Sequence, residues 1–153
     1  MLRSAMIVVP VTVVVGALAV ATLQHHLPIG PVVLLLSTIP IAVLLVAGRR
    51  ISAAIPDLVF GSIDTGLLVV PALWGGMTFG VAGAVAGGVV GDALSDSIAG
   101  LFEGQVAEWL RARGFEESRE AVTTALGKMS GCLLGSGLVL SVALLFGISL
   151  EVV

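Results

Sequence analysis

The stretch GGVVGDALSDSIAGLFEG, from Gly87 to Gly104, places three carboxylic acids, Asp92, Asp96 and Glu103, among glycine and apolar residues. The chain around it has 153 residues, of which 58% are hydrophobic and 11% are charged, and its mean hydropathy is +1.17. Soluble globular domains carry about 25% charged residues, so this chain has too few polar side chains to cover a water-facing surface. The composition therefore predicts an integral membrane protein with lipid as its outer solvent.

Apolar windows of about 20 residues, the length that crosses the hydrocarbon of a bilayer, occur at five positions. They predict a single all-α domain of five membrane-spanning helices, at about residues 5–23, 31–48, 58–74, 77–100 and 128–147. Only Trp74-Gly75-Gly76 separates the third span from the fourth, which predicts a tight reversal there. The charged segment 103–124 is expected to continue both flanking helices into the cytoplasm, with Gly114 as a C-cap that ends the first.

The basic residues predict the orientation. All of them fall on one side of the membrane if the chain starts inside and crosses five times: Arg3, Arg49, Arg50, Arg111, Arg113, Arg119 and Lys128. The positive-inside rule then places the amino terminus in the cytoplasm and the carboxyl terminus outside. Trp74 and Trp109 are expected at the outer and inner interfaces, where amphipathic rings prefer to lie.

The fourth span carries small residues at helical spacing. Steps of four give the row Gly76, Gly80, Ala84, Gly88, Asp92, Asp96, Gly100 and Gly104. The fifth span repeats the spacing with Gly127, Gly131 and Gly135. Such patterns let membrane helices approach closely, so we expect these two faces to meet and the aspartates on the row to point into the protein.

Three aspartates are expected near the middle of the membrane. At about 1.5 Å per residue, Asp64 lies roughly 10 Å beyond Asp57, and Asp92 lies roughly 20 Å from Gly76, with Asp96 one turn further on. A charged residue at that depth costs about 2.5 to 3.5 kcal/mol on insertion scales. The orientation assigns every basic residue to the inner surface, so no internal counter-charge is available. The aspartates must be protonated or must hold a cation from solution.

Hydroxyl groups near these aspartates favour the cation. Carboxylate, hydroxyl, carbonyl and water oxygens are the ligands of hard cations such as calcium, sodium and magnesium, and the sequence has no sulfur or imidazole set for a softer metal. The candidate ligands are Asp64, Asp92, Asp96, Ser62, Thr65 and Ser95. Glu103 is a candidate for recruiting ions at the inner mouth, although a solvated helical extension accounts for it more simply. We expect no resident cofactor.

Three stretches resemble one known family. FGSIDTGLLVV around Asp64, GDALSDSIAGL around Asp96 and LGKMSGCLLG from Leu126 to Gly135 are similar to the transmembrane protein 65 family. Its mitochondrial inner-membrane members are associated with sodium-dependent calcium efflux. The resemblance covers about Phe60 to Phe146 and implies a prokaryotic member in the plasma membrane. Asp64 and Asp96 match acidic positions of the family, whereas Asp92 and Thr65 stand where the mitochondrial members carry asparagine.

These features predict a secondary cation transporter, with calcium exchanged for sodium or protons at a carboxylate site in the membrane. Its partners would be lipid, metal cations and a second copy of the chain, because five short spans enclose little interior and transporters often need two halves moving against each other. The net charge of −3 is too small to indicate a nucleic-acid partner.

Other functions remain open. A transporter or channel for magnesium or another divalent cation would use the same ligands. A non-transporting assembly protein would use the acids only to fix helix register. An intramembrane aspartyl protease also needs two aspartates on consecutive helices. The spacing from Gly88 to Asp92 misses the Gly-x-Gly-Asp arrangement by one residue, and the chain has no tyrosine, so we do not expect an enzyme.

Overall fold

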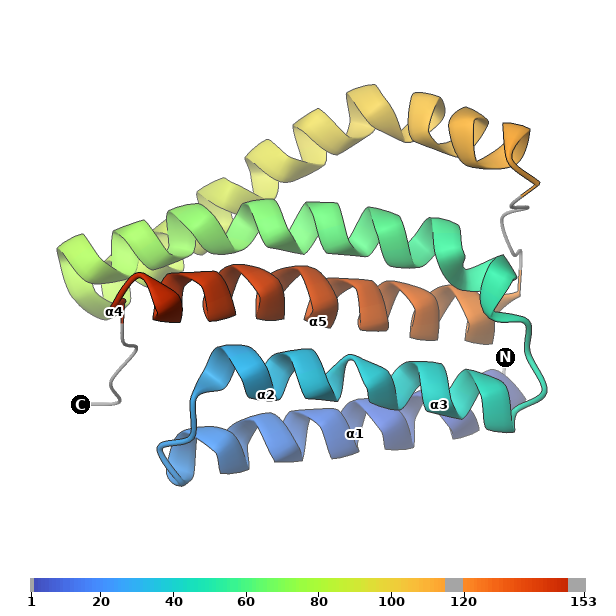
Figure 1. Cartoon of the computed structure of the whole chain (residues 1–153), viewed down its shortest axis with the longest axis horizontal. Helices are drawn as coiled ribbons and strands as arrows, with labels where there is room; N and C mark the ends of the chain where they lie inside the picture. The colour runs from blue at the N-terminus through green and yellow to red at the C-terminus, as the bar shows by residue number, and fades with distance from the viewer. Residues whose placement is uncertain (1, 115–119, 149–153) are drawn as a thin grey trace.

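In the computed structural model the described residues, 2–114 and 120–148, form helices joined by short connections. No strand occurs among them. Figure 1 shows the five helices: α1 (Leu2–Gln24), α2 (Ile29–Leu36), α3 (Thr38–Val46), α4 (Ile51–Ala112) and α5 (Ala121–Leu145). The all-α prediction is therefore confirmed for the part of the chain that the structure describes.

Four segments are long and apolar enough to cross a membrane: Ser4–Gln24, Ile29–Val46, Ile51–Ile98 and Ala121–Leu145. The second of them consists of α2 and α3, which the sequence predicts as one uninterrupted span. The helix is interrupted at Ser37 because Pro40 has no N–H to donate to the carbonyl of Leu36. Ser130 of α5 supports the interruption, since its hydroxyl donates to the Ser37 carbonyl at 2.6 Å.

The long helix α4 reverses direction at Gly80. This residue has φ 65° and ψ −150°, a conformation that is essentially restricted to glycine. The first half of α4, residues 51–79, and the second half, residues 81–112, therefore lie antiparallel (Figure 1). The predicted reversal at Trp74-Gly75-Gly76 is wrong, because Gly75 is helical and packs against Gly83 of the second half.

The glycine faces pack differently from the prediction. The glycine face of α5 does not contact the glycine face of the second half of α4. Each of them packs against a different side of the first half of α4. Gly127, Gly131 and Gly135 lie against Ala54, Leu58 and Ser62. Gly83, Gly87 and Gly91 lie against Gly75, Pro71 and Leu68. The physical reason is that both neighbours present glycines to the first half of α4, so a backbone can approach it closely on two sides.

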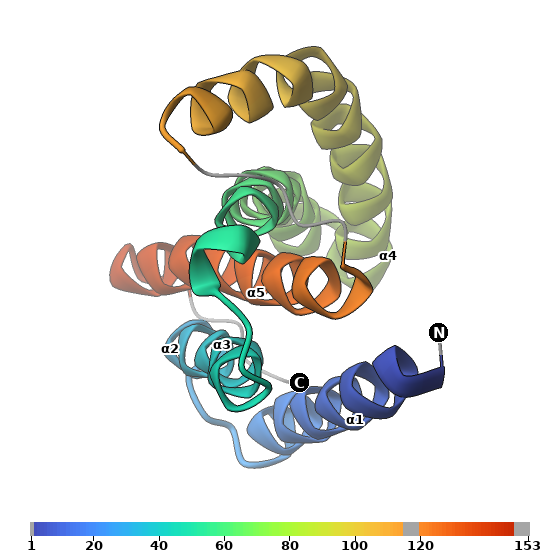
Figure 2. The same ribbon diagram turned by 90° about the vertical axis from the view of Figure 1, so that its right-hand side faces the viewer.

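The helices form a stack. Figures 1 and 2 show the order α1, then α2 with α3, then α5, then the first half of α4, then its second half. The main hydrophobic core lies around α5 and its neighbours, where Leu44, Val122 and Leu126 are buried. The second half of α4 is at one edge of the stack, and most of its residues between Val81 and Ile98 are exposed on the single chain.

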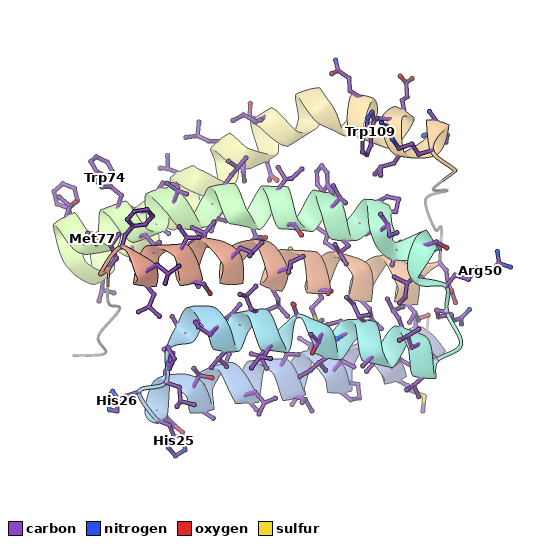
Figure 3. All side chains as sticks on the ribbon, in the orientation of Figure 1. His25, His26, Arg50, Trp74, Met77 and Trp109 are labelled. Atoms are coloured by element: carbon purple, nitrogen blue, oxygen red, sulfur yellow. The ribbon has the colours of Figure 1, made fainter. Side chains whose placement is uncertain are left out.

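Several charged and aromatic residues lie at the two ends of the stack. Arg50 and Trp109 lie at one end, and His25, His26, Trp74 and Met77 lie at the other (Figure 3). At the Arg50 end, Arg49 pairs with Glu120 at 2.6 Å, and the Arg113 guanidinium lies 3.5 Å from the centroid of the Trp109 ring.

The predicted helical extension is observed on both sides of residues 115–119, which lie outside the described part of the chain. The second half of α4 continues to Ala112, and α5 begins at Ala121, seven residues before the predicted span. Gly114 has φ 82° just after α4, which confirms it as the residue that ends this helix.

Candidate cation site

A polar contact between described side chains joins the two halves of α4. The Ser95 hydroxyl donates to Asp64 Oδ1 at 2.8 Å, across 31 residues of sequence. Ser95 is only 2% exposed and Asp64 is partly buried. Two of the predicted ligand residues are thus brought together, one from each half.

The packing above this contact explains its position. Successive pairs down the two halves, Gly75 with Gly83, Pro71 with Gly87 and Leu68 with Gly91, hold the backbones close together. The next pair in the series is Asp64 with Ser95. At about 1.5 Å per residue both side chains lie roughly 23 Å from Gly80 along their helices, so they share one depth. The hydrogen bond is therefore fixed by the register of the reversal.

Asp92 and Asp96 do not join this contact through their side chains. Both carboxylates are exposed on the single chain, so the prediction that they point into the protein is wrong for one copy. The face of the second half that packs against the first is the row Gly83, Gly87, Gly91 and Ser95. Asp92 and Asp96 each follow a residue of that row, and one residue is a rotation of about 100° around the helix.

The backbone of Asp92 does belong to the site. Its carbonyl oxygen lies 3.1 Å from the Ser95 hydroxyl, which can donate to it as an alternative to Asp64. Side-chain spacing in the sequence gives no signal for a backbone carbonyl, so sequence reasoning identified Asp92 only by its carboxylate.

Two other predicted ligands flank Asp64. The Ser62 hydroxyl donates to the Leu58 carbonyl of its own helix at 2.7 Å, and its own carbonyl packs against Gly135. Thr65 is partly buried next to Asp64. Glu103 lies on α4, but its side chain is outside the described part of the structure.

Lys128, one of the basic residues assigned to the inner surface, contacts an aromatic ring on the helix that carries Asp64. Lys128 Nζ is 5.7 Å from the centroid of the Phe60 ring, and Phe60 precedes Asp64 by one helical turn.

The described residues contain no group of three or more His, Cys, Asp or Glu side chains close enough together to hold a metal ion. A single chain brings together one carboxylate, one hydroxyl and one backbone carbonyl at Asp64. Such oxygens suit a hard cation, but they are fewer than the six to eight that calcium takes, so water or other protein groups would have to complete the shell.

Comparison with protein families, with curated proteins and with solved structures found no match for this chain.

Proposed function

We propose that the protein is a multi-pass membrane transporter that binds a hard cation at Asp64. The single observation that carries the proposal is the Ser95–Asp64 contact, a carboxylate and a hydroxyl held together within an apolar helix pair. Among the described residues, the ion pair between Arg49 and Glu120 lies at the basic end of the stack and not beside Asp64. A cation from solution is then the simplest neutralising partner for a carboxylate at this depth.

We propose that the chain crosses the membrane five times, with its amino terminus inside. The reversal at Gly80 supports this number, because it divides the long apolar segment Ile51–Ile98 into two antiparallel passes. The location of Arg50 and Trp109 at one end and of His25, His26 and Trp74 at the other supports the orientation (Figure 3).

Calcium, exchanged for sodium or protons, is the proposed cargo. Carboxylate, hydroxyl and carbonyl oxygens are the ligands that calcium prefers. The resemblance of the stretches around Asp64 and Asp96 to the transmembrane protein 65 family supports the same choice and a location in a prokaryotic plasma membrane.

A second copy of the chain is proposed to cover the second half of α4. On the single chain this half exposes Asp92 and Asp96 within the apolar segment Ile51–Ile98, at a cost of about 2.5 to 3.5 kcal/mol for each charge that faces lipid. A homodimer through this face would remove the carboxylates from lipid and would add oxygen ligands to the cation site. Gly88 on the same helix has almost nothing against it, which would allow close approach.

Flux through proteoliposomes tests the proposal. The wild-type protein should take up calcium when the vesicles contain sodium, and Asp64→Asn should abolish this uptake while leaving the protein folded. Glu108→Gln is the matched control, because Glu108 is an exposed carboxylate beyond the apolar segment. Normal calcium flux in Asp64→Asn would remove Asp64 from the site. Uptake that persists without a sodium or proton gradient would indicate a channel, and uptake of magnesium alone would change the cargo.

The Ser95–Asp64 bond also favours a second function, that of an assembly protein in which a protonated Asp64 only fixes helix register. Thermal unfolding of the purified protein in detergent separates the two. A cation that binds only the folded state raises its stability by about 2.7 kcal/mol at 100 times the dissociation constant. No change in unfolding temperature with calcium, sodium or magnesium would favour the assembly protein.

A further inference from the structure

We propose that the single hydroxyl hydrogen of Ser95 changes acceptor when a cation occupies Asp64, so that the Ser95 oxygen becomes a ligand of the cation. The inference rests on the cation site proposed above and assigns one of its residues a specific mechanism.

Two acceptors compete for one proton. The Ser95 hydroxyl lies 2.8 Å from Asp64 Oδ1 and 3.1 Å from the carbonyl oxygen of Asp92. A serine hydroxyl has one hydrogen to donate and two lone pairs that can accept. With 2% of its surface exposed, Ser95 has almost no access to water that could supply other partners.

The two acceptors are of different kinds. Asp92 lies three residues before Ser95, and its carbonyl is the ordinary acceptor for a serine inside a helix. Ser62 and Ser136 of the neighbouring segments donate to carbonyls of their own helices in this way. The bond from Ser95 to Asp64 is different because it reaches a carboxylate on another segment, and a bond to an ionised acceptor is the stronger one.

When no cation is bound, the Ser95 hydroxyl therefore donates its hydrogen to Asp64. The hydroxyl hydrogen then serves as the positive partner of the carboxylate, which keeps Asp64 from facing the apolar interior without a donor.

A cation at Asp64 reverses the preference. Its charge repels the hydroxyl hydrogen and attracts the Oγ lone pairs. Rotation of the hydroxyl about the Cβ–Oγ bond moves the hydrogen to the Asp92 carbonyl, which is already within reach, and turns a lone pair toward the cation. Neither helix has to move, and the Ser95 hydroxyl and the Asp64 carboxylate each have a partner in both states. Ser95 is thus a substitute cation in the empty site and a ligand in the loaded one.

The experiment compares Ser95→Ala, Ser95→Thr and Ser97→Ala in the full chain in detergent. Calcium chloride and sodium chloride are the probes, and calorimetry gives the affinities. Ser95→Ala loses a ligand oxygen, so its calcium dissociation constant should rise about tenfold, the usual worth of one hydrogen-bond-sized interaction. Ser95→Thr keeps the hydroxyl and should restore most of the affinity. Ser97, an exposed serine of the same helix, is the control and should have no effect when replaced.

Infrared difference spectra give a readout that packing alone would not change. The carboxylate stretch of Asp64, assigned by its loss in Asp64→Asn, should shift in the wild-type protein on adding calcium as the hydrogen bond from Ser95 is lost. In Ser95→Ala the carboxylate stretch of Asp64 should differ from that of the wild type even without a cation, because the hydrogen bond from Ser95 is missing. Ser95→Thr should show the wild-type spectrum.

Wild-type affinity in Ser95→Ala together with an unchanged Asp64 band would overturn the proposal. So would a wild-type Asp64 band whose hydrogen bond persists in saturating calcium, a measurement that needs no variant at position 95 to fold. Either result would still be compatible with the proposed transport function, provided that Asp64→Asn abolishes cation binding. Unchanged binding in Asp64→Asn would instead remove the cation site itself.

Discussion

Gly131 of α5 lies so close to the Leu58 carbonyl of α4 that no side chain fits at position 131. Gly131→Ala should therefore destabilise the protein by about 1–3 kcal/mol, the usual cost of overpacking. Gly16→Ala is the matched control, since nothing lies within 4 Å of an added Cβ there and alanine is the better helix former. Thermal unfolding in detergent measures both, and equal unfolding temperatures for the two variants would contradict the packing.

A buried serine of α5 supports the interruption between α2 and α3. Ser130 is 1% exposed and its hydroxyl bonds the Ser37 carbonyl, so Ser130→Ala should cost about 1–3 kcal/mol by leaving that acceptor without this donor. Ser136→Ala should change stability little, because the Ser136 hydroxyl only supplements bonding within its own helix. Unfolding in detergent gives the comparison. A larger loss for Ser136→Ala would argue against the role of Ser130.

The proposed homodimer can be tested by cross-linking in native membranes. Cys132 is the only cysteine, so a Cys132→Ser background carries no thiol. Val89→Cys on the second half of α4 should form a disulfide-linked dimer on oxidation. Val13→Cys on α1, at the opposite edge of the stack, should stay monomeric although the two valines are similarly exposed, at 67% and 63%. Cross-linking at position 13 and not at position 89 would place the interface on the wrong side.

The proposed orientation predicts which residues a membrane-impermeant maleimide can reach from outside the cell. In the same background, His25→Cys should be labelled in intact cells, and Arg50→Cys should be labelled only after the membrane is opened. The two residues lie at opposite ends of the stack (Figure 3). Labelling in the opposite order would invert the chain in the membrane and would remove the positive-inside assignment.

Hydropathy alone predicts most of the helices, because an apolar run of about 20 residues has few other structures available in lipid. It does not predict where a run turns. Gly75, Gly76 and Gly80 all lack a Cβ, so each of them could adopt a positive φ and form the reversal. Only contacts between the two halves of α4 select Gly80. The interruption at Ser37 could have been anticipated from Pro40, although proline is also tolerated inside membrane helices.

The same uncertainty limits the prediction of the site. A reversal at Gly75 would place Asp64 opposite about Ala86, whereas the reversal at Gly80 places it opposite Ser95. The sequence identified Asp64 and Ser95 separately, each as a candidate ligand, but their partnership depends on a register that no local pattern encodes. The outward position of Asp92 and Asp96 has the same origin, since small residues occur on more than one face of their helix.

The position of α5 has a consequence for the order in which the protein is built. In the described structure α5 contacts every other helix, whereas α1 and α2 have no contact with α4 and α3 has only a slight one. Of these five helices α5 is synthesised last, so the four earlier ones form two groups with little to hold them together. In a chain that stops before residue 121, the two groups would remain covalently connected but would not pack against each other. A separately supplied α5 segment would contact both groups and bring them together.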